Sequence, residues 1–191
     1  MTTITAPVLT ELDLRAGLWT VDKMHSAVIF SIRHLGLSKV RGRFEEFDAS
    51  LAATESLAAS RISASINLAS INTNNTDRDH HLRSSDFFSV DTNPTMEFVS
   101  TGITGADDDW TLNGDLTLNG VTRPVSLAVE YNGVQTNPNS GQLHAGFTAT
   151  GTIKRSEFGI RFGLAAIGVD KLALSDDVKI ELDLQFVEPA A

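Results

Sequence analysis

The segment Trp110-Thr111-Leu112-Asn113-Gly114-Asp115-Leu116-Thr117-Leu118 alternates strictly between apolar or small residues and polar ones. A period of two places these two sets on opposite faces of a β-strand, one toward an apolar interior and one toward water. The same alternation recurs over 178–186, where Val, Ile, Leu, Leu and Phe alternate with Lys, Glu, Asp and Gln. Asn119-Gly120 follows the first segment and predicts a tight hairpin. Both segments therefore indicate an antiparallel all-β protein.

The rest of the chain carries the same pattern. Besides a minor strand at 19–22, it predicts eight strands, over residues 28–33, 39–51, 60–71, 95–104, 110–118, 122–131, 143–154 and 176–187. Phe44 and Phe47 cannot share a face of a regular strand, so we expect a β-bulge near Glu45–Glu46. A short helix over 77–83, capped by Asn75 or Thr76, interrupts the strands. Because a closed barrel leaves no exposed strand edge, the prediction is an all-β antiparallel barrel with one short helix.

Composition sets limits on function. The chain has 191 residues, no cysteine and a net charge of −9. We expect an N-terminal arm over 1–17 and one barrel domain over 18–191. The negative charge argues against nucleic acid and against broad binding to anionic membranes, although it does not exclude a local basic site. No apolar run approaches the roughly 20 residues of a membrane span. The first residues do not resemble a secretory signal, so the expected location is the cytoplasm.

Four colinear motifs resemble the YceI-like family. The longest is Arg78-Asp79-His80-His81-Leu82-Arg83-Ser84-Ser85-Asp86-Phe87-Phe88, preceded by Ala69-Ser70-Ile71-Asn72-Thr73. The others are Trp19-Thr20-Val21-Asp22 with His25-Ser26 and Arg33-His34-Leu35-Gly36, the segment 114–124, and Arg155 with Phe158-Gly159-Ile160. The resemblance implies an extended, eight-stranded, lipocalin-like barrel that carries a long isoprenoid or another lipid-like molecule in its pore. Many relatives are exported with a leader peptide, and we expect this protein to differ from them in that respect.

Small residues on the expected inner faces favour a container over a filled core. The alternative is a solidly packed interior, but Ala64, Ala145, Ala149 and Gly114 leave space where branched side chains would fill it. Together with the resemblance, they predict a ligand tunnel with an apolar wall. The expected wall consists of Phe30, Ile32, Ala64, Ile66, Phe98, Leu116, Leu127, Val129, Ala145, Phe147, Ala149, Leu182 and Leu184.

The expected mouth of the tunnel is polar. Arg78, His81 and Arg83 of the short helix, with Arg33 and His34 of the first hairpin, are candidates for holding a ligand head group, because arginines bind phosphate and carbonyl oxygens well. The alternative is that Arg78 and Asp79 bond to the turn backbone and fix the helix.

Other classes of function have weaker support. Asp77 and His81 would share a helix face, and His25, His34 and His80 could converge on it, but no known metal-ligand spacing occurs, so neither a metal nor a cofactor is expected. A small hydrolase-like or stress-related enzyme using His81 with Ser84 or Asp86 is an alternative to a non-catalytic carrier, although the chain has no nucleophile elbow, phosphate loop or dinucleotide fingerprint. A structural barrel without ligand is the third class. The irregular, apolar segment 155–175 is expected to cover either the barrel mouth or a neighbouring subunit, and its stretch 158–167 suggests a homodimer.

Overall fold

The computed structural model describes residues 12–106, 109–164 and 173–188. Its elements are β1 (Gly17–Val21), β2 (Ala27–His34), β3 (Ser38–Phe44), β4 (Phe47–Ala53), β5 (Arg61–Asn67), β6 (Ile71–Asn72), α1 (Thr76–Arg83), β7 (Thr95–Ala106), β8 (Asp109–Leu118), β9 (Val121–Thr136), β10 (Leu143–Lys154) and β11 (Leu174–Val187), with 3₁₀ turns at Leu57–Ala59, Leu68–Ser70 and Arg155–Phe158. Within these ranges, no helix is long and apolar enough to cross a membrane.

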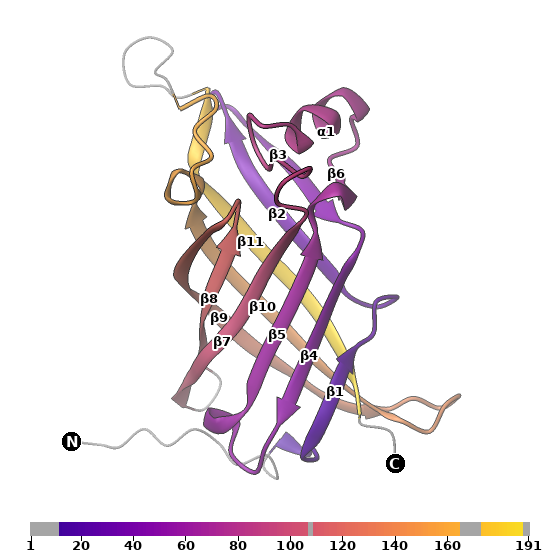
Figure 1. Cartoon of the computed structure of the whole chain (residues 1–191). Coiled ribbons are helices and arrows are strands. Elements are labelled where there is room, and N and C mark those ends of the chain that lie inside the picture. Colours follow the sequence, from indigo (N-terminus) through magenta and orange to yellow (C-terminus); the bar gives the residue numbers. More distant parts are fainter. Residues whose placement is uncertain (1–11, 107–108, 165–172, 189–191) are drawn as a thin grey trace, which may run out of the picture.

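The strands form a closed antiparallel barrel (Figure 1). The order is β1-β4-β5-β7-β8-β9-β10-β11, and β11 pairs back with β1, which closes a ring of eight strands in the described part of the chain. The predicted fold class, an eight-stranded antiparallel barrel with one short helix, is therefore confirmed. The predicted hairpin after β8 is present as well, because Leu118 pairs with Val121 and both Asn119 and Gly120 adopt positive φ values.

At two places in the barrel, two consecutive short strands separated by a break take the place of one long strand. β1 and β2 pair with successive parts of β11, and residues 22–26 loop out between them. β3 pairs with β2, whereas β4 pairs with β1 and β5. The single bulged strand expected over 39–51 is thus wrong: two strands replace it, separated at Glu45–Glu46. The break still turns both Phe44 and Phe47 into the interior, where they are buried.

The expected strand over 60–71 also ends early. β5 stops at Asn67, and Leu68–Ser70 form a 3₁₀ turn before the short β6. The turn buries Leu68 completely and leads to α1. There the side chain of Asn75 accepts a hydrogen bond from the amide of Arg78, so Asn75 is the predicted cap.

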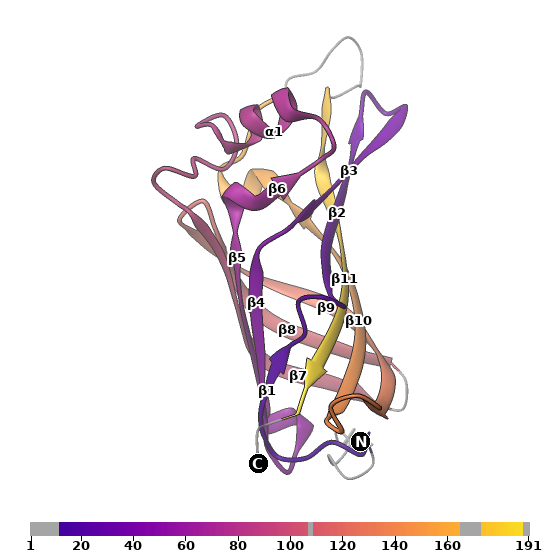
Figure 2. The same ribbon diagram turned by 90° about the vertical axis from the view of Figure 1, so that its right-hand side faces the viewer.

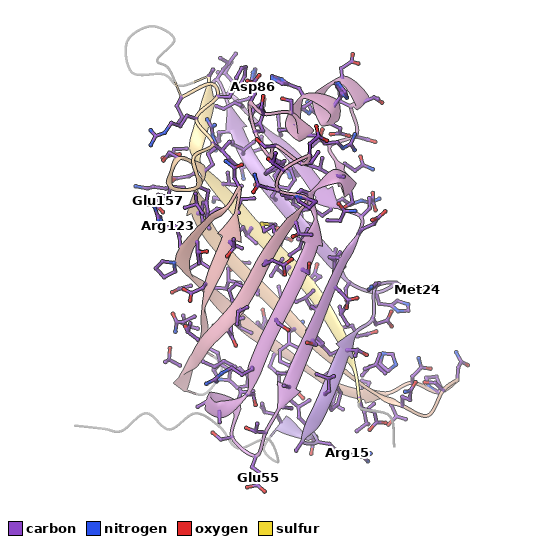
Figure 3. All side chains as sticks on the ribbon, in the orientation of Figure 1. Arg15, Met24, Glu55, Asp86, Arg123 and Glu157 are labelled. Carbon is purple, nitrogen blue, oxygen red and sulfur yellow. The ribbon has the colours of Figure 1, made fainter. Side chains whose placement is uncertain are left out.

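The two ends of the barrel differ. α1 lies at one end, together with the turn between β2 and β3 (Figure 2). Arg15 and Glu55 are at the opposite end, whereas Asp86 lies near α1 (Figure 3).

Aromatic side chains fill the end away from α1 and form what we call the floor. Trp110 stacks on Tyr131 with ring centroids 6.1 Å apart, Tyr131 contacts Phe147 at 5.3 Å, and Phe147 contacts Phe186 at 6.0 Å. Trp19 of β1, a strand at the same end of the barrel, is fully buried as well (Figure 1).

The described part of the expected N-terminal arm packs against this floor. Leu14 is buried, and Trp19 donates its indole N–H to the carbonyl of Arg15 at 2.8 Å. Burial, with the nearby carboxylate of Asp13, raises the pKa of Tyr131 to about 12. Its hydroxyl therefore stays protonated and donates to the carbonyl of Leu12. Residues 1–11 of the arm lie outside the described residues.

Candidate functional site

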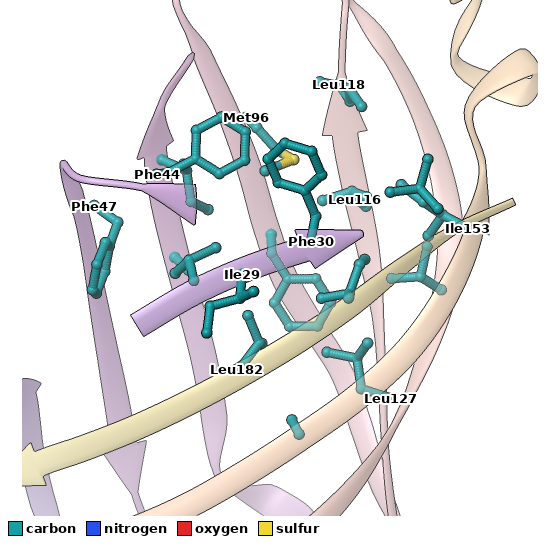
Figure 4. A pocket seen from close by; sticks show the side chains of 18 of the residues that line it. Ile29, Phe30, Phe44, Phe47, Met96, Leu116, Leu118, Leu127, Ile153 and Leu182 are labelled. Atoms are coloured by element: carbon teal, nitrogen blue, oxygen red, sulfur yellow. The ribbon is translucent and has the colours of Figure 1, made fainter. Parts of the chain in front are cut away.

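The barrel encloses a cavity of about 520 Å³ above the floor. Figure 4 shows its wall, where Phe30, Phe44, Leu116, Leu127 and Leu182 project from different strands toward one space. The lining is almost wholly apolar along the strands, where Asp48 of β4 is a polar member, and its other polar groups lie toward the end that holds α1. The volume lies within the range of roughly 300–1,000 Å³ that is usual for small-molecule sites.

The expected wall residues line this cavity, with one exception. Those that line it are Phe30, Ile32, Ala64, Ile66, Phe98, Leu116, Leu127, Val129, Phe147, Ala149, Leu182 and Leu184. Ala145 does not. It pairs with Phe186 at the floor and is fully buried by protein atoms. Its small side chain therefore accommodates the floor aromatics and leaves no ligand space.

Gly114 is a second small residue that does not open space. A Cβ atom built there would lie 2.3 Å from Cζ of Phe98 and 2.7 Å from the carbonyl oxygen of Val99. The missing side chain thus makes room for the Phe98 ring, which itself lines the cavity.

Sequence reasoning missed further wall residues. Ile62, Leu112, Val178 and Ile180 share faces with expected members of the wall, so the same alternation would have found them. Phe44 and Phe47 were not included in the expected wall, because the break between β3 and β4 interrupts the alternation between them. Arg155, Ile160 and Phe162 come from an irregular segment, where no periodicity gives a signal.

Three of the five expected mouth residues line the cavity: His34, Arg78 and His81. Arg78 donates from Nε to Oγ1 of Thr73 and from Nη2 to its carbonyl oxygen, both at 2.7 Å. The carboxylate of the buried Asp79 accepts bonds from the amide and hydroxyl of the same Thr73. These contacts agree with the alternative interpretation, in which Arg78 and Asp79 fix the helix to the preceding turn.

Arg33 and Arg83 do not line the cavity. Ile32 and His34 face inward on β2, so the intervening Arg33 faces outward and is exposed. Arg83 donates to the carbonyls of Ala69 at 2.8 Å and Ile71 at 3.0 Å, and thus ties the end of α1 to the chain before it.

An aromatic cluster spans the mouth between α1 and the segment 155–164. The ring of His81 contacts Phe87 at 5.2 Å and Phe162 at 4.8 Å, and these two phenylalanines contact each other at 5.1 Å. His81 Nε2 also lies 2.8 Å from a carboxylate oxygen of Asp86. The hydroxyl of Ser84 donates instead to the backbone carbonyl of His81. The His81–Asp86 pair of the enzyme alternative is thus present, while the serine bonds elsewhere.

A buried arginine anchors that segment. Arg155 is 4% exposed, and its guanidinium donates to the carbonyls of Ser175, Ile160, Phe162 and Leu174 at 2.6–3.3 Å. Burial lowers its pKa from the usual value, which the nearby Asp176 opposes. Arg155 thereby ties the segment 155–164 to the start of β11.

The motif around Asp22 lies away from the cavity and holds the loop between β1 and β2. Asp22 accepts from the amide of Met24 and contacts His25 Nδ1 at 2.8 Å, while Ser26 Oγ accepts from the amide of Gln185 at 2.9 Å. Burial alone would raise the pKa of Asp22, but these bonds and the nearby His25 and His144 hold it below its ordinary value. Among the described residues, no three His, Asp or Glu side chains are arranged to hold a metal ion.

The apolar stretch expected to form a dimer surface is only partly internal, because Phe162 is 46% exposed. Phe158 and Ile160 are buried in their own chain, and residues 165–167 lie outside the described residues.

Comparisons with known proteins agree with this geometry. The model of the YceI-like domain family matches residues 19–186. A UPF0312 protein of Staphylococcus epidermidis is 40% identical over 166 residues, which cover 86% of this chain and 94% of the relative. The crystal structure of the Campylobacter jejuni YCEI protein has a TM-score of 0.71 at 30% identity and covers 83% of this chain and 91% of its own.

A more distant structure shares the fold alone. It is a polyisoprenoid binding domain from Saccharophagus degradans, implicated in plant cell wall breakdown, with a TM-score of 0.63 at 16% identity, covering 90% of this chain and 98% of its own.

Proposed function

Because this chain belongs to the family of proteins with a YceI-like domain, we propose that it binds and carries a long isoprenoid or another lipophilic chain molecule inside the barrel, without catalysing a reaction. The observation that carries the proposal is the apolar cavity of about 520 Å³. A cavity with so few polar partners holds water poorly, since a buried water molecule needs several hydrogen bonds.

Burial of the ligand chain supplies the affinity. Transfer of apolar surface from water yields roughly 25 cal/mol per Å², before the costs of ordering the ligand and its loss of free motion. A long hydrocarbon chain therefore needs few polar contacts to bind. The same wall accepts chains of different chemistry, as long as they are apolar and slender.

The polar groups at the mouth orient the ligand. Thr73 occupies Nε and one N–H of Nη2 of Arg78, so other guanidinium N–H groups can donate to a head-group oxygen. His34 and His81 line the same end. We therefore place a phosphate, carbonyl or quinone oxygen near Arg78 and the chain toward the floor.

Two alanines on β10 provide a matched test. Ala149 lines the cavity, whereas Ala145 faces the filled floor, and both lie on the same face of the same strand. Ala149→Phe should abolish or strongly weaken uptake of a fluorescent isoprenoid and leave the melting temperature of ligand-stripped protein nearly unchanged. Ala145→Phe should cost about 1–3 kcal/mol of stability through overpacking.

The opposite pattern would reject the cavity as the ligand site. If Ala149→Phe destabilises the protein and leaves uptake intact, this face is solid core and the ligand binds elsewhere. Mass spectrometry of an organic extract of the purified protein identifies the natural ligand. Turnover of model esters that is lost in His81→Asn would favour the enzyme alternative instead.

Cytoplasmic location and homodimer formation stay predictions. Cell fractionation and sedimentation equilibrium test them, and the carrier function requires neither.

A further inference from the structure

The hairpin of β2 and β3 is strongly cationic although the chain as a whole is acidic. Residues 27–44 contain Arg33, Lys39, Arg41 and Arg43 and no Asp or Glu. At its tip, between β2 and β3, Leu37 is 77% exposed. A single exposed leucine is common on a protein surface, so what distinguishes Leu37 is its position among basic residues and beside a second exposed apolar side chain.

The arrangement of the cations is unfavourable for the isolated protein. Arg33 pairs directly with Lys39 across the hairpin, and both face outward, because Ile32 and Val40 line the cavity. Like charges opposite each other destabilise a strand pair. Glu45 neutralises Arg43 at 2.8 Å, but no ion pair within the described ranges involves Arg33, Lys39 or Arg41. The three charges are free to meet an external anion.

A second pair of cation and apolar side chain lies beside the hairpin. Arg161 is exposed, and its neighbour Phe162 is 46% exposed at the cavity mouth. Backbone hydrogen bonds connect the two places: Leu35 donates to Ala173, and Leu174 donates to Gly163. The hairpin tip lies at the same end of the barrel as α1 (Figure 2). The cations and the exposed apolar groups therefore surround one rim of the mouth.

We propose that this rim docks on an anionic lipid surface, with Arg33, Lys39 and Arg41 against the head groups and Leu37 and Phe162 inserted among the upper acyl carbons. Cations beside apolar side chains are the combination that interfacial binding requires. A purely polyanionic partner would explain the charges but would leave Leu37 in water. The net charge of −9 disfavours broad contact between the chain and such a membrane, so contact is confined to the cationic rim. The purpose of docking rests on the proposed carrier function, because a ligand could then pass between bilayer and barrel without crossing water.

The test is sedimentation of the full chain with vesicles of phosphatidylcholine alone or with 30% phosphatidylglycerol, a composition of about one anionic lipid in three. We expect binding to the anionic vesicles only, and its loss at high salt. Arg33→Gln and Lys39→Gln should each weaken it about fivefold, which corresponds to the contribution of one cation near a charged membrane. Leu37→Ser should weaken it without changing the salt dependence. Arg61→Gln and Leu18→Ser, at the opposite end, are the matched controls and should bind normally.

Several results would overturn the proposal. They are equal binding to both kinds of vesicle, no binding to either, or full binding by the double variant of Arg33 and Lys39. Binding to heparin that is lost in this double variant but unaffected by Leu37→Ser, without vesicle binding, would assign the hairpin to a polyanion. Uptake of the fluorescent isoprenoid from dilute ethanol, measured in the same variants, tests the carrier function separately. Normal uptake without vesicle binding would reject docking and leave the carrier function intact.

Discussion

Gly114 and Gly42 show how single atoms shape the cavity wall. A Cβ atom at Gly42 would lie 2.5 Å from the Phe30 ring, just as one at Gly114 would meet Phe98. Both phenylalanines line the cavity; Phe30 pairs directly with Gly42, whereas Phe98 pairs with Leu116 and its ring reaches diagonally over Gly114. The absence of a side chain at the two glycines thus makes room for the rings of Phe30 and Phe98 at the cavity wall.

This close approach predicts the effect of Gly114→Ala. Because the new methyl group would meet a ring and a backbone carbonyl, neither of which can move freely, we expect a loss of about 1–3 kcal/mol in unfolding free energy. Gly102→Ala is the control, since nothing lies within 4 Å of the position that its Cβ would occupy and the change should be neutral or stabilise by up to about 1 kcal/mol. Urea unfolding measures both. Equal effects of the two substitutions would contradict the proposed contact.

The two β10 alanines, Ala145 and Ala149, show that alternation predicts which face of a strand a residue lies on but not its position along the barrel axis. The period of two correctly turns Ala145, Phe147 and Ala149 inward. It cannot tell that Ala149 lines the cavity whereas Ala145 lies at the floor. This difference depends on the aromatic rings that β8, β9 and β11 place at one end of the barrel, and these contacts are long-range. Arg33 is different: its neighbours Ile32 and His34 already point inward, so parity alone would have placed it outside.

At the scale of the elements, the 3₁₀ turn at Arg155–Phe158 and the residues after it, up to 164, lie at the mouth of the barrel, and we call this segment the cap. Ser156 donates its amide and hydroxyl to the carboxylate of Asp176, at 2.9 and 2.7 Å. Burial alone would raise the pKa of Asp176, but these bonds and the nearby Arg155 and Lys154 hold it below its usual value. The cap is therefore fixed to β11 by a carboxylate that favours its charged form.

This anchor predicts a pH-dependent effect of Asp176→Asn. A carboxyl whose folded pKa is lowered stabilises the protein above its unfolded pKa, near 4, and loses that contribution as the pH falls through the folded value. The substitution should cost about 1.5–3 kcal/mol at pH 7, and the cost should shrink below about pH 4. Asp177→Asn, at an exposed neighbour, should show little cost at either pH. If Asp176→Asn still lowers the unfolding free energy at pH 3, the geometry of the side chain, and not its negative charge, fixes the cap to β11.

The aromatic cluster at the mouth predicts a kinetic effect of Phe162→Ala. Phe162 joins the cap to His81 and Phe87, yet it is almost half exposed, so its removal should change the unfolding free energy by less than about 1 kcal/mol. Ligand entry and exit should both accelerate, because the contact across the mouth is lost. Stopped-flow fluorescence measures the two rates. Unchanged rates would place the entry path elsewhere in the wall.

The elements also show where sequence reasoning ends. Regular alternation identified the long strands from β7 to β11, and the two candidate caps, Asn75 and Thr76, identified α1. The segment after Arg155 has no period, so its apolar composition predicted only that it covers something, and the hydrogen bonds by which Arg155 holds it could not be predicted. The break at Glu45–Glu46 depends on β3 and β4 pairing with different partners, which is long-range information that local spacing does not contain.

The whole molecule is a container that is filled at one end and polar at the other. A closed barrel of eight strands leaves an interior about one slender ligand wide. The floor of Trp19, Trp110, Tyr131, Phe147 and Phe186 occupies one part of it, and the rest forms the cavity. Arg78 and His81 belong to α1, at the other end. This polarity implies a single orientation for an amphipathic ligand, with its chain toward the floor.

Orientation and cavity length together predict how binding depends on the ligand. Each added methylene that becomes buried contributes about 0.8 kcal/mol, so affinity should rise with the number of isoprene units until the chain reaches the floor, and then level off. A fluorophore on the head group should remain accessible to iodide, whereas one at the chain terminus should be shielded by the floor aromatics. Titrations along a series of chain lengths and quenching of the two labelled ligands measure these effects. A shielded head group with an accessible terminus would reverse the orientation, and affinity that rises without limit would mean that the chain leaves the barrel past the floor.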